Sequence, residues 1–213
     1  MKLTKALESL CHGDVEQAEL ARQWLRQHGR DQVPLFLETL ESELHRDGEF
    51  SPIHYDYTGA VVRYPRRKSV LRLAELMADL GDCRALPALM RLAPTFDKPF
   101  LQLIEALESQ DTPGVRDALL EALSTLRQQR QMSLALRVAR ALLELVESNP
   151  DPVFRAALPL LAPGFGVPLE FFVIRYRFKT LLASHNLPIP TDAPALGQDF
   201  PIPTDERDSN APC

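Results

Sequence analysis

LGDCRALPALMRLA, at residues 80–93, is the stretch that decides the fold of this chain. It recurs in altered form as SQDTPGVRDALLEAL at 109–123 and as SNPDPVFRAALPLL at 148–161. In each copy an apolar helix end meets a polar break that holds Asp and then Arg, and a new helix follows. Self-similarity of this kind predicts stacked helical hairpins, because one hairpin cannot bury its apolar face alone.

The helices themselves are predicted from apolar residues at i, i+3, i+4 and i+7, the spacing of one buried helix face. The longest series are Val115, Ala118, Leu119, Ala122, Leu123 and Leu126, and Ala135, Val138, Ala139, Leu142, Leu143 and Val146. Shorter series cover 3–11, 20–25, 33–44, 70–77, 86–93, 100–107 and 153–161. We therefore expect an all-α protein in which Leu119 and Leu142 are fully buried.

Helix boundaries carry signals of their own. Thr112–Pro113 and Asp151–Pro152 each place a capping oxygen just before a proline at the first helical position. Gly29 and Gly81 stand at helix ends, where a residue that tolerates positive φ is favoured. The stretch 25–40 loosely parallels 77–92, with a glycine and then a proline, and we interpret it as a degenerate first repeat.

The sequence GDCRALPAL at 81–89 resembles HEAT repeats, including those found in bilin lyases. The resemblance to the HEAT-repeat and armadillo-type family implies a right-handed α-solenoid of about four to five helical hairpins. Its spacing is uneven: Asp82 and Asp111 are 29 residues apart, and Asp111 and Asp151 are 40 apart. Stacked repeats of this type leave a long concave surface free for a partner.

Two segments depart from the repeat pattern: one lies within the repeat domain at 1–185, and the other follows it. The first is DGEFSPIHYDYTGAVVRYPRRK at 47–68, too long and too aromatic for a plain connector. Thr58 and Gly59 could form the turn of a short hairpin within it. The insertion serves either as a recognition surface, since tyrosine and arginine are favoured in binding hot spots, or as a cover over one end or groove of the array.

The second segment is the proline-rich tail at 186–213, which repeats LPIPTDAP at 187–194 as FPIPTDER at 200–207. The tail holds five acids and one base, so it carries −4 of the net charge of −5 and leaves −1 for residues 1–185. Prolines favour an extended backbone that fits grooves. The tail is either without a specific partner or a paired docking motif, and intramolecular docking onto basic groups of the body is a third hypothesis.

Composition narrows the classes of function. No apolar run approaches the roughly 20 residues of a membrane span, and the N-terminus lacks the apolar core of a signal peptide. The sequence therefore predicts a cytoplasmic protein without a membrane partner. A near-neutral body with an acidic tail disfavours nucleic acid as the partner.

The sequence contains no strong motif for catalysis or metal binding. Cys11, Cys83 and Cys213 are odd in number and widely spaced, which disfavours disulfides and zinc. The polar cluster His45, Asp47, Glu49, His54 and Asp56 matches no established metal site. We expect no metal, cofactor or catalytic residue.

The sequence thus predicts a non-catalytic adaptor or scaffold that binds a protein partner on the concave surface and the 47–68 loop. Candidate partner-binding residues are tyrosines and arginines of the insertion and arginines of the acid-free stretch 122–143: Tyr55, Tyr57, Arg63, Tyr64, Arg66, Arg67, Arg127, Arg130, Arg137 and Arg140. Arg175, Arg177 and Lys179 form a further basic group. Either these surface cations pair with acids of neighbouring helices, or they bind an acidic partner. The alternative function is a HEAT-like enzyme, of the bilin lyase type or, with less support, of the DNA glycosylase type.

Overall fold

A computed structural model describes residues 1–47, 54–55, 61–62, 68–94, 96–150, 152–162 and 168–187. These residues are almost entirely helical, so the prediction of an all-α protein is confirmed. The ten α-helices formed by the described residues are α1 (Leu3–His12), α2 (Val15–His28), α3 (Val33–Asp47), α4 (Lys68–Leu80), α5 (Leu86–Leu92), α6 (Lys98–Glu108), α7 (Pro113–Gln128), α8 (Met132–Ser148), α9 (Ala157–Leu160) and α10 (Glu170–Ser184).

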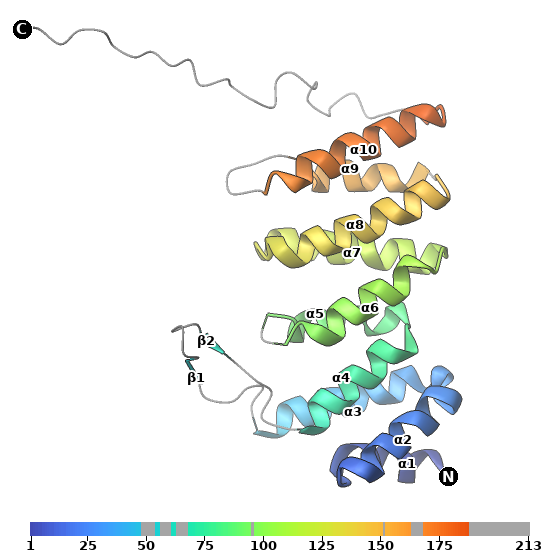
Figure 1. The fold of residues 1–213 in the computed structure, drawn as a ribbon, viewed down its shortest axis with the longest axis vertical. Helices are drawn as coiled ribbons and strands as arrows, with labels where there is room; N and C mark the ends of the chain where they lie inside the picture. The colour runs from blue at the N-terminus through green and yellow to red at the C-terminus, as the bar shows by residue number, and fades with distance from the viewer. Residues whose placement is uncertain are drawn as a thin grey trace, which may run out of the picture.

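The helices stack in chain order along the long axis of the molecule, from α1 at one end to α10 at the other (Figure 1). Each odd-numbered helix contacts the even-numbered helix that follows it. Helices α4, α6, α8 and α10 contact one another in succession and form one layer, whereas α5, α7 and α9 do the same in a second layer behind them. Contacts therefore link mainly elements that are near one another in the sequence.

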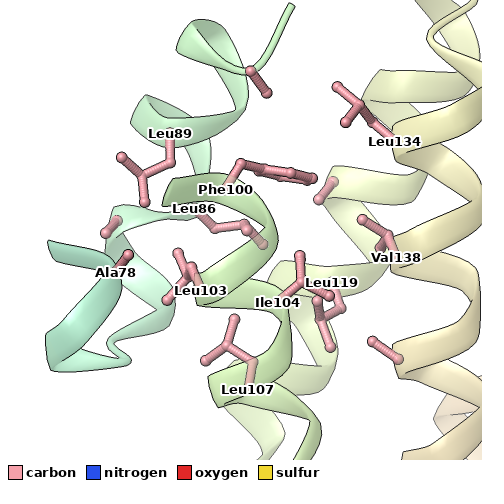
Figure 2. Packing of buried hydrophobic residues seen from close by; sticks show 14 of the residues in the cluster. Ala78, Leu86, Leu89, Phe100, Leu103, Ile104, Leu107, Leu119, Leu134 and Val138 are labelled. Atoms are coloured by element: carbon pink, nitrogen blue, oxygen red, sulfur yellow. The ribbon is translucent and has the colours of Figure 1, made fainter. Parts of the chain in front are cut away.

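One continuous apolar cluster runs through the stack, from Ala6 on α1 to Leu182 on α10. Figure 2 shows its central part, where side chains of α5, α6, α7 and α8 meet. Leu119 and Leu142 are both 0% exposed, as the apolar periodicity predicts. The spacing of apolar residues thus located the core-facing sides of the central helices correctly.

Two helix ends confirm the predicted boundary signals. Thr112 precedes α7, and its hydroxyl oxygen accepts a hydrogen bond from the amide of Val115 at 3.4 Å. Gly81 follows α4 with φ of +63°, a conformation that costs an L-residue about 1–2 kcal/mol. The predicted cap at Asp151 lies outside the described residues.

The prediction of positive φ at Gly29 is wrong, because its φ is −105°. A side chain is excluded there for a different reason. A Cβ atom on Gly29 would lie 2.6 Å from the carbonyl oxygen of Leu25 and 2.9 Å from Cζ of Phe36. Close packing of α3 against the end of α2 therefore requires glycine at this position.

At two places, residues that were predicted to face the core are not buried. Leu20 is 59% exposed, on a helix near the end of the stack whose main contacts are with α1 and α4. Ala156 is exposed and Leu160 is half-buried. Residues Pro152–Ala156 form a 3-10 helix rather than a turn of α-helix, which changes the angular spacing of the side chains.

The insertion contains two short strands, β1 (His54–Tyr55) and β2 (Val61–Val62). They pair in antiparallel orientation, with His54 opposite Val62 and Tyr55 opposite Val61. The two extended runs of the predicted hairpin are therefore confirmed. The predicted turn at Thr58 and Gly59 lies outside the described residues.

Candidate functional site

A groove of about 410 Å³ lies between α5 and α7. Its apolar lining includes Leu86, Pro87 and Met90 of α5 and Ala118 and Ala122 of α7. We call this feature the α5–α7 groove. Its volume falls in the range of about 300–1,000 Å³ that is typical of ligand-binding pockets.

Small residues on α7 create the space. Gly114 and Ala118 are one turn apart on the row of α7 that faces the groove. A Cβ atom added at Gly114 would have no other atom within 4 Å. Helix α5 begins after the 3-10 turn Cys83–Ala85, and Pro87 stands in its first turn. The groove is therefore open along α7, because Gly114 and Ala118 leave this row of the helix without a large side chain.

The positive charge beside the groove is paired within the chain, whereas two negative charges beside it are not paired with any described residue. Arg84 and Asp82 form an ion pair, with 2.6 Å between Nη2 and Oδ2, and the hydrogen bond from Arg84 lowers the pKa of Asp82. Asp117 and Glu121 are both exposed and stand one turn apart on α7. In the part of the chain that the structure describes, neither acid forms an ion pair. The rim of the groove is therefore negative.

Two further depressions lie beside the groove, toward the N-terminal end of the stack. A second depression shares Cys83 and Arg84 with it and is lined also by Gly81, Gln110 and Thr112. A third depression, lined partly by residues of α2, shares Arg30 and Leu80 with the second. The polar breaks of the sequence repeats, at 81–84 and 109–112, thus both line the second depression.

The predicted arginines of the stretch 122–143 do not form one patch of free cations. The Nη2 of Arg127 donates a hydrogen bond to the carbonyl oxygen of Ala162 at 2.9 Å. The Arg127 guanidinium also lies over the ring of Phe171, 5.0 Å from its centre, and burial lowers its pKa. Arg127 therefore holds α7 against the C-terminal helices.

The remaining three arginines of that stretch differ in their contacts. Arg137 of α8 forms an ion pair with Glu105 of α6 at 3.2 Å. Arg130 and Arg140 are exposed, and neither forms an ion pair with a described residue. Arg130 has φ of +59° at the end of α7. These two residues remain candidates for binding a partner.

The third basic group is not a surface cluster. Arg175 is only 3% exposed, because it lies on the face of α10 that packs into the core. Arg177 pairs with Glu147 of α8. On the same layer, Arg22 of α2 pairs with acids of α4. Several of the surface cations thus form ion pairs with acids of the next helix in the same layer. This was one of the two alternatives that the sequence left open.

The predicted residues of the insertion cannot be placed in a site. Tyr55 belongs to β1, and its side chain is not described. The other predicted residues of the insertion, Tyr57, Arg63, Tyr64, Arg66 and Arg67, lie outside the described residues. Most side chains of the polar cluster at 45–56 are also outside them. Within the described ranges, no three metal-binding side chains come together.

The cysteine thiols of the described helices are poor nucleophiles. Cys11 is buried between helices, and burial raises its pKa to about 11. Cys83 lines the α5–α7 groove, and burial likewise raises its pKa. Both thiols are therefore protonated at neutral pH, when a thiol reacts slowly. Cys11 is a packing residue of the apolar cluster.

The sequence analysis missed the α5–α7 groove and the acids Asp117 and Glu121. The only signal was Gly114 and Ala118, two small residues one turn apart. None of the described helices is both long enough and apolar enough to cross a membrane. Comparisons of the chain with family models, curated proteins and solved structures found no match.

Proposed function

We propose that this chain is a non-catalytic scaffold, an α-solenoid of the HEAT-like type, that binds a segment of a partner protein in the α5–α7 groove. The observation that supports the binding role is the open apolar floor of the groove between two helices of one layer. The succession of contacts from α4 to α10 supports the solenoid architecture. The 47–68 insertion and the concave surface are further candidate contacts.

The chemistry of the groove favours binding over catalysis. Its only thiol, that of Cys83, has a raised pKa and is protonated at neutral pH. Its carboxylates, Asp117 and Glu121, are exposed to solvent and not held by a hydrogen-bonding partner among the described residues. A general acid or base is normally positioned by a hydrogen-bonding partner. Neither carboxylate has such a partner among the described residues.

The size of the groove sets the expected affinity. A fully buried aliphatic side chain contributes about 1.5–3 kcal/mol. The groove has room for about two or three such side chains, and part of their contribution is offset by the lost freedom of the bound segment. A dissociation constant in roughly the micromolar range is expected. Additional contacts in the two neighbouring depressions would increase the affinity.

Peptide display tests the proposal. The full chain is immobilised, and a library of random peptides is selected for binding. Each selected peptide is then measured against Ala118→Trp, whose indole fills the groove, and against Ser133→Trp, the same change at an exposed position of α8. Thermal unfolding of each variant checks that it is folded.

We expect selected peptides that bind the wild-type chain and Ser133→Trp equally but lose affinity for Ala118→Trp. Gly114→Leu is a second blocking variant, since the space above Gly114 is open. A selection without any peptide that is sensitive to either blocking variant would contradict the proposal.

A further inference from the structure

We infer that the segment bound in the α5–α7 groove is basic as well as apolar: a short stretch in which lysine or arginine flanks aliphatic residues. This inference rests on the proposed function, and it adds the chemistry of the partner. Three features of the described residues carry it: the apolar floor, the two unpaired acids on the α7 side, and the neutralised cation on the opposite side.

The two acids are placed to receive cations. Asp117 and Glu121 stand at i and i+4 on α7, beside the half-buried Ala118 of the groove floor. The aliphatic stem of a bound lysine or arginine can cover the floor while its charged end reaches these carboxylates. An apolar floor with an acidic rim is therefore complementary to a segment that combines both kinds of side chain.

The cation on the opposite side of the groove does not pair with these two acids. Arg84, the cation of the rim, is held by Asp82 through three hydrogen bonds from its guanidinium, at 2.9, 3.1 and 2.6 Å. Its charge is thus offset within the chain. Among the described residues that line the α5–α7 groove, an acidic ligand would find no unpaired cation and would meet two carboxylates.

Several acids on the layer of even-numbered helices are paired with arginines of the same chain. In the layer of even-numbered helices, Glu75 and Asp79 pair with Arg22. Glu105 and Glu147 of that layer also pair with arginines of a neighbouring helix. The acids of the α5–α7 groove have no such neighbour and remain available to an outside cation.

Charge also disfavours two other occupants. The tail at 186–213 carries −4, so the acidic rim would repel it. A second copy of the chain, placed groove to groove about a twofold axis, would bring Asp117 and Glu121 of both copies together. Like charges at such a contact are unfavourable. A basic segment of another protein remains the occupant that fits.

The test measures the composition and the charge dependence of the display-selected peptides. The full chain is compared with the double variant Asp117→Asn/Glu121→Gln and with a matched control, Glu16→Gln/Glu19→Gln, which neutralises two exposed acids of α2. We expect lysine and arginine to be enriched over acids in peptides that Ala118→Trp no longer binds. Their affinity should fall about 2- to 30-fold in the groove double variant, the effect of losing two exposed ion pairs, and stay unchanged in the control.

Two kinds of failure are distinguishable. Peptides that are blocked by Ala118→Trp but are rich in acids, or indifferent to Asp117→Asn/Glu121→Gln, would overturn the basic partner and leave the proposed function standing. A selection that yields no peptide sensitive to Ala118→Trp would overturn both. As a further check, affinity for the basic peptides should weaken as salt is raised, because salt screens exposed charges.

Discussion

Replacing Leu119 by alanine tests the packing of the stack most directly. Leu119 is 0% exposed on α7, and Figure 2 shows its side chain among those of Ile104 and Val138. The change removes three carbon atoms from the core, a loss of about 2.4 kcal/mol at about 0.8 kcal/mol for each. Because helices on both sides hold the walls apart, a cavity remains, and the total loss should reach about 3–5 kcal/mol.

Urea unfolding followed by circular dichroism measures this loss in the free energy of unfolding. The melting temperature should fall by about 6–20 °C, since a chain of this size loses about 2–4 °C for each kcal/mol. Leu20→Ala is the matched control, because Leu20 is 59% exposed, and its effect should stay within about 0.5 kcal/mol. A loss below about 1 kcal/mol for Leu119→Ala, or equal losses for both variants, would refute the packing described here.

Three further substitutions test local features. Gly81→Ala should destabilise the chain by about 1–2 kcal/mol in urea unfolding, because φ at Gly81 is +63°. Gly114→Ala should instead stabilise it by about 0.5–1 kcal/mol, since its new Cβ meets no atom within 4 Å; a loss there would contradict the open groove. Hydrogen bonds from Asn149 and from Arg116 lower the pKa of Asp111, so its contribution to stability is present above its ordinary pKa near 4 and is lost as the pH falls further. Asp111→Asn should therefore show a smaller loss of stability on acidification than the wild type, and parallel pH profiles would count against this role.

The helices could be predicted from the sequence because their signals are local. Apolar residues at i, i+3, i+4 and i+7 define a buried face without knowledge of the neighbour, and this placed Leu119 and Leu142 correctly in the core. The cap at Thr112 and the positive φ at Gly81 depend on a few adjacent residues and were predicted for the same reason. The paired strands of the insertion were likewise anticipated from a short stretch of sequence.

Helix α10 shows where periodicity is insufficient. It carries apolar side chains on two opposite faces, so its sequence does not indicate which face is buried. In the structure Phe171, Ile174 and Phe178 pack into the core, whereas Val173 and Tyr176 are exposed. The choice follows from the contacts of α10 with α8 and α9, which only the fold supplies.

The sequence by itself determined that the chain is all-α, where most helices begin and end, and which residues face the core, since each of these depends on neighbours within one or two turns. Only the tertiary structure decided the candidate site. Arg137 meets Glu105 across 32 positions of the chain, and Arg127 reaches Ala162 across 35. Such pairings, and the space left beside Gly114, depend on how each helix is rotated against the next. That rotation is set by the packing of side chains from different helices, which no local pattern encodes.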